Sequence, residues 1–251
     1  MTLFDLTGRV ALVTGGNGGI GLGMAKGMAD AGASVMVAGR NKEKSAAAAK
    51  ACGAKAASVE VDVTKADEVE AMVKATVDRF GAIDILVINA GINIRKPAHE
   101  ASFEEWHAVL SANLDAAFLT AKAAYPALKT SGRGKVITTG SMTSLFGAAF
   151  APAYSASKGG IVQFTRSIAA AWAPDNIQCN AILPGWIDTD LTRQARKDVP
   201  GLNERVLART PAGRWGSGED FAGIAVFLAS SASDFVTGTA IPVDGGYSST
   251  I

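Results

Sequence analysis

Short apolar runs alternate along the chain with longer segments whose apolar residues recur every three or four positions. Short runs rich in β-branched residues are typical of buried strands, and recurrence at helical spacing is typical of helices with one buried face. The predicted strands cover residues 9–14, 34–38, 56–61, 84–88, 134–140, 177–183 and 239–243. The clearest predicted helices cover residues 66–80, 103–129, 153–173 and 218–230.

This alternation predicts one α/β domain over residues 1–251. A crossover through a helix keeps successive strands parallel and is nearly always right-handed. We therefore expect a doubly wound, Rossmann-type parallel sheet of seven strands with helices on both faces. Residues 185–217 lack a firm pattern and contain Pro200, Pro211 and Gly216. They are predicted to form a mobile substrate lid with one or two short helices.

Several helix ends are marked by particular residues. Gly81 and Gly132 follow helical patterns, and glycine readily adopts the left-handed conformation that ends a helix. Ser102, followed by Glu104 and Glu105, is typical of a helix start.

Composition narrows the class of protein further. The 251 residues, 48% of them apolar, can bury the core of one domain. With 24 basic and 23 acidic residues and no basic run, nucleic acid is not an expected partner. Without a signal peptide or a span of membrane length, a cytoplasmic protein without membrane contact is expected. Cys52 and Cys179 are predicted free thiols, and His99 and His107 surface residues, so no metal site is expected.

A glycine-rich segment follows the first predicted strand and precedes a helical stripe that includes Met24 and Met28. Its glycines permit a tight turn and close approach to a pyrophosphate, which the helix N-terminus then faces with free N–H groups. Two registers fit equally well, Gly16-x-Gly18-x-x-Gly21 and Thr14-Gly15-x-x-x-Gly19-Ile20-Gly21. A flexible glycine-rich turn is the alternative interpretation.

The end of the second predicted strand bears on cofactor choice. NAD sites usually place Asp or Glu here to bind the ribose 2′-hydroxyl, but residues 38–41 contain neither. Arg40 stands in this segment, and a guanidinium can pair with a 2′-phosphate. The sequence therefore favours NADP(H), with NAD(H) still possible if Arg40 is solvated or stacks on adenine.

Tyr154 and Lys158 are four positions apart, so a helix places both on one face. A free phenol has a pKa near 10, about 3 units too high for easy proton exchange at neutral pH. An ammonium about 4 Å away in a shielded site supplies about the 4 kcal/mol needed. The pair can thus act as a general acid or base, although the spacing alone is common by chance.

Polar residues beside small ones follow three predicted strands, and such strand ends meet at one crevice. They are Asn89-Ala90-Gly91, Thr138 to Ser141, and Pro184-Gly185. Together with the glycine loop and the tyrosine–lysine pair, they make the chain resemble the short-chain dehydrogenase/reductase family over nearly its whole length. Further matching motifs are Asp62-Val63, Asn113, Ile187 with Thr189, and Val243 to Gly246. Ser141 also precedes Tyr154 by thirteen positions, the usual family separation.

The resemblance implies catalytic roles. Tyr154 would exchange the hydroxyl proton, and Ser141 would hold the substrate oxygen. Lys158 would lower the pKa of Tyr154 and bind the nicotinamide ribose, while Asn113 would position a water that links Lys158 to solvent. Asn113 could otherwise be an ordinary polar residue of a helix.

The resemblance also implies the residues that bind the dinucleotide. They are Gly15, Asn17, Gly18, Gly19, Ile20, Gly21, Arg40, Asn41, Asp62, Val63, Asn89, Ala90, Gly91, Tyr154, Lys158, Pro184, Gly185, Ile187 and Thr189. Asp62 and Val63 would flank the adenine, and Ile187 and Thr189 would hold the carboxamide. Asp62 could instead cap a strand end, and Thr189 could simply begin a helix. Ile88 departs from the family pattern, which often has a second asparagine there.

The implied activity is interconversion of a secondary alcohol and a ketone. The stretch from Arg209 to Gly216 looks most like sugar and sugar-acid dehydrogenases, such as gluconate or glucose dehydrogenases. Candidate pocket residues are Asn93, Arg95, Met142, Leu145, Phe146, Phe150, Trp186 and Leu191. Arg95 could pair with a carboxylate, whereas the largely apolar remainder suits a hydrophobic or cyclic ketone equally well. A non-catalytic dinucleotide sensor or scaffold, and an epimerase or dehydratase, are the alternatives.

A homotetramer is expected from the resemblance, formed through the helices at 103–129 and 153–173. The second helix carries an apolar set, Ile161, Phe164, Ile168 and Trp172, which is interpreted as its outer face. The protein's own sheet could equally cover this set.

Overall fold

The computed structural model describes residues 3–250 and contains the predicted parallel seven-stranded sheet. The strands are β1 (Val10–Thr14), β2 (Ser34–Gly39), β3 (Ala56–Glu60), β4 (Ile85–Ile88), β5 (Gly134–Thr139), β6 (Ile177–Pro184) and β7 (Ala240–Val243). Their order is β3-β2-β1-β4-β5-β6-β7, and every neighbouring pair is parallel. The predicted doubly wound α/β fold is confirmed. The chain reverses its direction across the sheet between β1 and β4, which opens a crevice at their carboxyl ends.

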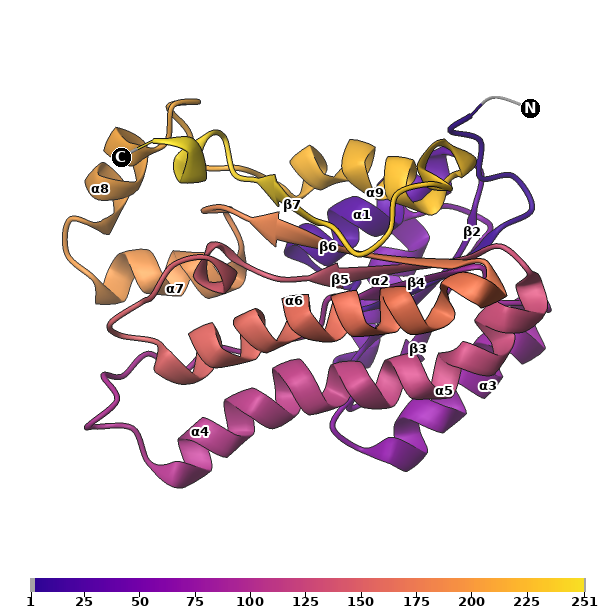
Figure 1. Ribbon diagram of the computed structural model, residues 1–251, viewed down its shortest axis with the longest axis horizontal. Coiled ribbons are helices and arrows are strands. Elements are labelled where there is room, and N and C mark those ends of the chain that lie inside the picture. The colour runs from indigo at the N-terminus through magenta and orange to yellow at the C-terminus, as the bar shows by residue number, and fades with distance from the viewer. Residues whose placement is uncertain (1–2, 251) are drawn as a thin grey trace.

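Helices cover both faces of the sheet (Figure 1). One face carries α1 (Gly19–Asp30), α2 (Lys42–Ala51) and α9 (Ala222–Ala229). The opposite face carries α3 (Ala66–Phe80), α5 (Ala116–Ser131) and α6 (Pro152–Trp172). The remaining helices are α4 (Phe103–Leu110), α7 (Asp190–Asp198) and α8 (Leu202–Arg209). Helices α7 and α8 lie beyond the carboxyl end of β6 (Figure 1).

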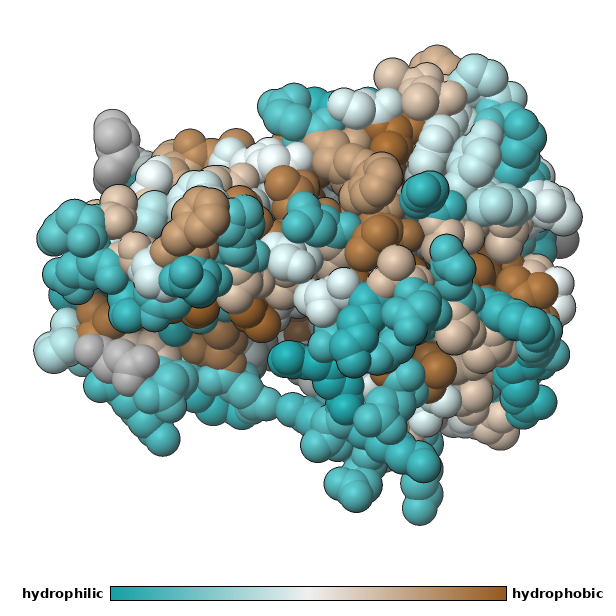
Figure 2. Space-filling model, turned by 90° about the horizontal axis from the view of Figure 1, so that it is seen from below, coloured by the Kyte–Doolittle hydropathy of each residue, from teal (hydrophilic) through white to brown (hydrophobic). Residues whose placement is uncertain are grey.

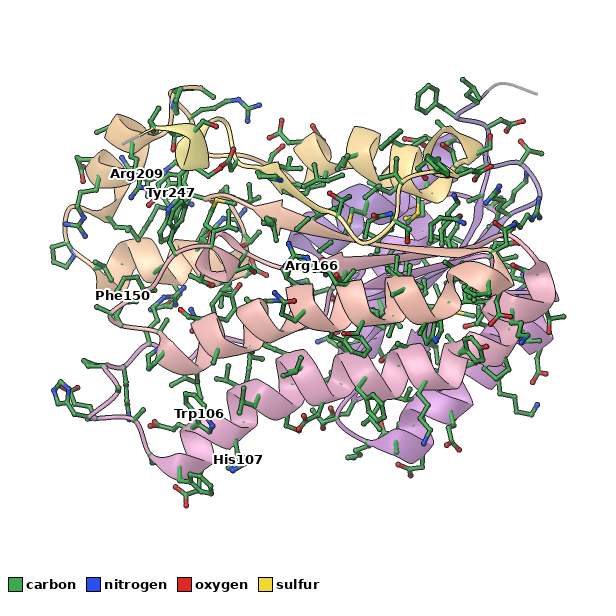
Figure 3. The ribbon with its side chains drawn as sticks, in the orientation of Figure 1. Trp106, His107, Phe150, Arg166, Arg209 and Tyr247 are labelled. Atoms are coloured by element: carbon green, nitrogen blue, oxygen red, sulfur yellow. The ribbon has the colours of Figure 1, made fainter. Side chains whose placement is uncertain are left out.

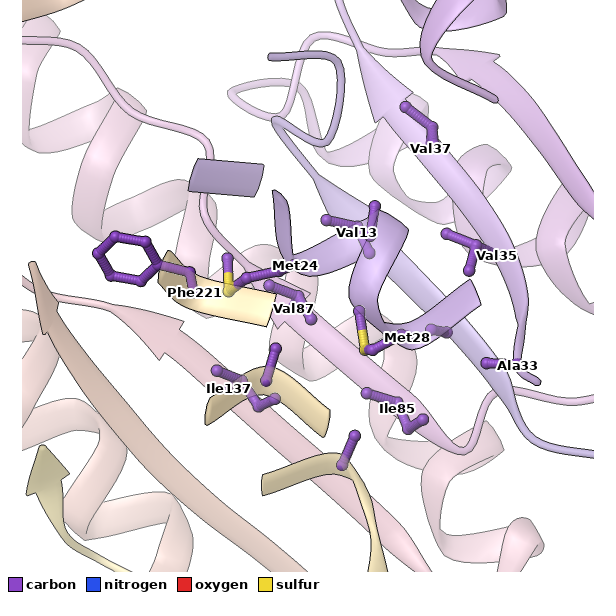
Figure 4. Packing of buried hydrophobic residues seen from close by; sticks show 14 of the residues in the cluster. Val13, Met24, Met28, Ala33, Val35, Val37, Ile85, Val87, Ile137 and Phe221 are labelled. Atoms are coloured by element: carbon purple, nitrogen blue, oxygen red, sulfur yellow. The ribbon is translucent and has the colours of Figure 1, made fainter. Parts of the chain in front are cut away.

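Alternate residues of each central strand enter opposite cores. In β1, Ala11 and Val13 pack towards α1, whereas Leu12 packs towards α5. Met24 and Met28 of α1 are fully buried on the first side, where Figure 4 shows them beside side chains of β1 and β4. Because both faces of a parallel sheet are covered, its central strands are largely apolar on both sides, as the sequence pattern indicated.

The predicted helix ends are confirmed. Gly81 and Gly132 end α3 and α5 in the left-handed conformation, with φ of 85° and 67°. Ser102 caps α4 by accepting the Glu105 N–H at 3.2 Å, and the Glu105 side chain accepts the Ser102 N–H at 2.9 Å. This reciprocal pair satisfies two N–H groups that the helix itself leaves free.

The predicted helix over residues 103–129 is wrong as one regular helix. A π-helical turn, Ser111–Asp115, separates α4 from α5. The extra residue in this turn accompanies the inward position of Asn113, whose side chain bonds the backbone of Ile92. Apolar periodicity cannot reveal such a turn, because it changes the register by only one residue.

The outer-face interpretation of the second helix is also wrong. Ile161 and Ile168 of α6 are buried in the core against the sheet, and Phe164 and Trp172 pack on the same core. These residues therefore give no support to a tetramer.

Residues 185–217 contain the two predicted short helices, α7 and α8. Ala195, Leu202 and Val206 form a small apolar cluster between them, and Trp186 and Trp215 pack on it. The mobility of this segment stays a prediction.

Hydrophobic surface lies in separate patches between hydrophilic side chains on the face of the molecule in Figure 2. Within residues 3–250, no helix combines the length and the apolar character needed to cross a bilayer.

A buried charged residue lies at the amino end of β5, the end of the sheet opposite the crevice. The Lys135 side chain in β5 is 1% exposed, and its ammonium donates to Asp234 at 2.7 Å. Burial lowers the pKa of Lys135, and the pairing with Asp234 opposes that shift. The carboxylate is the group that makes this buried ammonium tolerable.

We expect Asp234→Asn to lower the free energy of unfolding by about 2 kcal/mol, because it leaves a buried ammonium without its counter-charge. Urea unfolding measures this change. The matched control is Asp78→Asn, which breaks an exposed pair with Lys74 whose side chains are 60% and 75% exposed. That control should cost less than about 0.5 kcal/mol. Equal losses in the two variants would show that burial of Lys135 does not matter.

Candidate active site

A cavity of about 740 Å³ opens at the carboxyl ends of β1, β2 and β4. The predicted cofactor residues that line it are Gly15, Asn17, Gly18, Gly19, Ile20, Arg40, Asn41, Asp62, Val63, Asn89, Ala90, Gly91, Tyr154, Lys158 and Thr189. The predicted residues outside its lining are Gly21, Asn113, Ser141, Pro184, Gly185 and Ile187. Segments far apart in sequence thus converge on one cavity.

The close packing of the glycine loop resolves its register. Gly15 has φ of +63°, and a Cβ added there would lie 2.9 Å from Ala90 Cα. A Cβ added at Gly21 would lie 2.2 Å from the Gly15 carbonyl oxygen. Gly19 begins α1 with φ of +50°, whereas a Cβ at Gly18 would come no nearer than 3.4 Å to its neighbours. The structure therefore requires glycine in the Gly15-x-x-x-Gly19-x-Gly21 register.

The glycine loop fits a pyrophosphate. Helix α1 has no side-chain cap, and Gly18 and Ile20 at its start line the cavity. Free N–H groups and the positive end of the helix dipole therefore face the cavity. Asn89 braces the loop, because its amide donates to the Gly15 carbonyl oxygen at 3.1 Å and its side-chain oxygen accepts from Thr139 at 3.2 Å.

Arg40, Asn41, Lys44 and Asp62 also line the cavity. Asn41 caps α2 by accepting the Lys44 N–H at 2.8 Å. Asp62 accepts two hydrogen bonds from Thr64, at 3.1 and 2.8 Å. These bonds and the charge of Arg40 hold the pKa of Asp62 below its usual value. Asn41 and Asp62 thus serve the local backbone as well as lining the cavity.

Lys44 was not predicted as a site residue. It lines the cavity, and its ammonium donates to Asp190 of α7 at 2.8 Å. The sequence could have drawn attention to Lys44, because the helix dipole disfavours a cation in the first turn of a helix. Further lining residues that were not predicted are Val61, Thr64, Ile92, Ala108, Ser111 and Ala112.

Tyr154 and Lys158 lie one turn apart on α6 and both line the cavity. The Lys158 ammonium donates to the Thr139 carbonyl oxygen at the end of β5, at 2.7 Å, and lies 5.6 Å from the centre of the Tyr154 ring. A hydrogen bond also joins Ser141 to Tyr154. The structure therefore brings Ser141, Tyr154 and Lys158 together, as predicted.

Burial governs the ionisation of this group. It raises the pKa of Tyr154, and the hydrogen bond with Ser141 and the charge of Arg95 only partly oppose it. Burial also lowers the pKa of Lys158 to about 8. With this pKa the Lys158 ammonium is still mostly charged at neutral pH, and its lowering of the Tyr154 pKa stays a prediction. At neutral pH, Tyr154 is a protonated phenol that can donate its proton.

Asn113 lies in the π-helical turn and is 2% exposed. Its side-chain oxygen accepts the Ile92 N–H at 2.8 Å, and its amide donates to the Ile92 carbonyl oxygen at 3.0 Å and to Ser157 Oγ at 2.9 Å. Ser157 in turn donates to the Tyr154 carbonyl oxygen at 2.8 Å. Asn113 is therefore a buried link between Ile92 in the cavity wall and the turn of α6 that carries Tyr154 and Lys158. Its role with a water beside Lys158 stays a prediction.

The predicted residues after β6 mostly serve the fold. Ile187 is buried and pairs with Gly216 in an isolated β-bridge. A Cβ at Gly185 would lie 2.7 Å from Asp244 Cα, so glycine is needed there for packing. Thr189 both lines the cavity and begins α7 as its cap.

Among the candidate pocket residues, Arg95 acts on Tyr154 through its charge. Its guanidinium donates to the Leu191 carbonyl oxygen at 3.3 Å. Within residues 3–250, Asn93 Oδ1 and Thr143 Oγ1 are buried without a hydrogen-bond partner. Buried polar atoms of this kind are ordinarily satisfied, so both are suited to bind hydroxyl groups or water.

The aromatic candidates lie in or near residues 185–217. Trp186 packs edge-on against Trp215, with ring centres 5.6 Å apart. Arg209 stacks on Tyr247 at 4.4 Å and lies 5.4 Å from the ring of Phe146. Figure 3 shows Arg209 and Tyr247 together at the end of the molecule that carries α8.

The two histidines are exposed, as expected. His99 has a side chain that is 81% exposed, and His107 lies on α4 with Phe103 edge-on at 4.2 Å (Figure 3). Among the described residues, no group of three His, Cys, Asp or Glu side chains is placed to hold a metal ion.

Comparisons with known proteins agree with this geometry. A family model described as enoyl-(acyl carrier protein) reductase matches residues 15–248. A 2-dehydro-3-deoxy-D-gluconate 5-dehydrogenase of Escherichia coli (strain K12) is 44% identical over 187 residues, 74% of this chain and 74% of that protein. The structure of a gluconate 5-dehydrogenase from Burkholderia cenocepacia J2315, in complex with NADP and tartrate, is 40% identical with a TM-score of 0.94. The aligned region covers 99% of this chain and 98% of the gluconate 5-dehydrogenase chain.

A more distant similarity points to the same fold. The structure of levodione reductase is 31% identical, with a TM-score of 0.94, and covers 98% of this chain and all of its own. The family model spans most of the chain, and the relatives share its sequence and its fold. The chain belongs to the short-chain dehydrogenase/reductase family of oxidoreductases.

Proposed function

We propose that the protein is an NADP(H)-preferring oxidoreductase that interconverts a secondary alcohol and a ketone in a sugar acid. The oxidised dinucleotide and the alcohol would yield the reduced dinucleotide, the ketone and a proton. The observation that carries the proposal is that Tyr154 and Lys158 line the same cavity as the glycine loop. A proton-transfer pair therefore lies where a dinucleotide would place its reactive end.

The preference for NADP(H) is supported by the charges beyond the glycine loop. Arg40 lines the cavity, and residues 38–41 contain no carboxylate to bind a 2′-hydroxyl. The guanidinium of Arg40 suits a 2′-phosphate, which it can bind with two hydrogen bonds. The similar gluconate 5-dehydrogenase from Burkholderia cenocepacia is a complex with NADP.

The chain's own groups supply the proton chemistry, whereas the nicotinamide would supply or accept the hydride. Tyr154, protonated at neutral pH, would donate its proton to the oxygen that becomes a hydroxyl. Ser141 Oγ accepts the Thr143 N–H at 3.2 Å, and its hydroxyl, which is bonded to Tyr154 in this structure, would also bond the substrate oxygen. Lys158 would bind the ribose through the ammonium that Thr139 orients.

The substrate class is supported by Arg95 and the two buried acceptors. A guanidinium close enough to act on Tyr154 can hold a carboxylate beside the reacting carbon. Asn93 Oδ1 and Thr143 Oγ1 would accept hydroxyl protons of a polyhydroxy chain. Two of the similar proteins are named as dehydrogenases of gluconate and 2-dehydro-3-deoxy-D-gluconate. Closure of residues 185–217 over the substrate belongs to the same proposal.

We expect Tyr154→Phe to lower kcat for oxidation of D-gluconate by about 10³-fold, because the proton carrier is lost. Dinucleotide affinity should change by less than about 2-fold. Absorbance of the reduced dinucleotide measures turnover, and its fluorescence measures binding. Tyr125→Phe is the matched control, since Tyr125 bonds Asp175 and does not line the cavity.

The same experiment separates the alternatives. A sensor would bind the dinucleotide and turn over neither D-gluconate nor 2-dehydro-3-deoxy-D-gluconate. An epimerase or dehydratase would convert the sugar acid without a net change in reduced dinucleotide. Unchanged turnover in Tyr154→Phe would refute the tyrosine as proton carrier.

We expect Arg40→Ala to raise the Kd of NADPH by about 10-fold, because a charge-assisted bond to the 2′-phosphate is lost from an exposed position. The Kd of NADH should stay within about 2-fold, since NADH lacks this phosphate. Fluorescence titration measures both, and Arg79→Ala, remote from the cavity, is the control. Parallel weakening of NADPH and NADH would mean that Arg40 does not meet the 2′-phosphate.

We expect Arg95→Met to raise KM for D-gluconate by roughly 10- to 100-fold, the effect of losing a charge-assisted bond. D-Glucitol, which has the same hydroxyl chain without a carboxylate, is the matched control substrate. It also reports the influence of Arg95 on Tyr154 separately from binding. A rise in KM of the same size for D-glucitol would rule out a carboxylate contact.

A further inference from the structure

Ser144 lies between the two parts of the catalytic group. Its Oγ accepts the N–H of Ser141 at 3.1 Å and donates its proton to the carbonyl oxygen of Lys158 at 2.7 Å. One hydroxyl therefore joins the turn that carries Ser141 to the helix that carries Tyr154 and Lys158.

The Ser141 hydroxyl depends on this turn. Ser141 directly precedes a 3₁₀ turn, Met142–Ser144, and its Oγ accepts the Thr143 N–H at 3.2 Å. The Ser141 N–H is satisfied by Ser144 in return. Because each serine caps the other, a shift of this turn moves Ser141 Oγ relative to Tyr154.

Two hydrogen bonds of Lys158, one from its ammonium and one to its backbone carbonyl, join α6 to the end of β5 and to the turn that follows it. Its ammonium is bonded to the Thr139 carbonyl oxygen, and its backbone carbonyl is bonded to Ser144. A Cβ added at Gly140 would lie 3.0 Å from Ser144 Oγ, so the hydroxyl fills the space between strand end and helix. Without this hydroxyl, only the ammonium bond would hold the helix turn against the strand end at Lys158.

We propose that Ser144 is a positioning residue that sets the placement of Ser141 relative to Tyr154. This inference rests on the proposed function, in which Ser141 and Tyr154 bond the same substrate oxygen. It assigns Ser144 no contact with substrate. A misplacement of about 1 Å is enough to lower turnover by up to about 10²-fold.

The test is a double-mutant cycle on kcat for D-gluconate. Ser144→Ala is expected to lower kcat by about 10- to 100-fold, with the Kd of NADPH within about 2-fold. In a Ser141→Ala background the same change should lower kcat by less than about 2-fold, because Ser144 acts through Ser141. A full second loss in the double variant would overturn the proposal. Ser167→Ala is the matched control, since it removes a comparable bond from Ser167 Oγ to a backbone carbonyl in α6 at 2.9 Å.

Amide hydrogen exchange by mass spectrometry gives a readout that needs no substrate. Ser144→Ala should speed exchange in the peptide that covers residues 140–146, with the melting temperature nearly unchanged, and Ser167→Ala should not. Unchanged exchange there would overturn the positioning role whatever the substrate is. Absence of turnover in the unmodified protein, with the exchange result as expected, would instead count against the proposed function alone.

Discussion

Burial of Lys158 between α6 and the end of β5 is the constraint on which the rest of the site depends. A buried ammonium loses its hydration, which is why its pKa falls to about 8. Among the described residues, the Lys158 ammonium is stabilised by a hydrogen bond to the Thr139 backbone carbonyl oxygen, and no carboxylate lies at bonding distance from it. A carboxylate would stabilise the ammonium more strongly but would hold it away from a ligand. The stabilisation of the Lys158 ammonium therefore depends on the groups that bind beside it in the cavity.

Rigid neighbours make that arrangement possible. Asn113 and Ser157 hold the turn of α6 from the side of the π-helical segment, and Ser144 holds it from the side of β5. These groups are buried or half-buried, so their hydrogen bonds compete little with water. The turn of α6 that carries Tyr154 and Lys158 is thus held from two directions by uncharged side chains. These side chains place no further charge beside Tyr154 and Lys158.

The sequence predicted those features that depend on local periodicity or on a fixed spacing. All seven strands could be found because both faces of the sheet are covered and the strands are largely apolar runs. The face of α6 was misassigned because periodicity shows that Ile161 and Ile168 share a face but not what covers it. The glycine register needed the backbone angles and close contacts at Gly15 and Gly19, which no spacing contains. Ser144 was hidden among neighbouring hydroxyls, because only its three-dimensional partners distinguish it.

Charge near Tyr154 links substrate binding to the direction of the reaction. Burial keeps the phenol protonated, and the positive charge of Arg95 opposes this effect. In the proposed function a substrate carboxylate pairs with Arg95 and cancels much of that charge. A bound carboxylate would therefore weaken the lowering effect of Arg95 on the pKa of Tyr154. Reduction of the ketone would use the phenol in the protonated form that it holds at neutral pH. Oxidation of the alcohol would require Tyr154 to lose its proton first and would be favoured at higher pH.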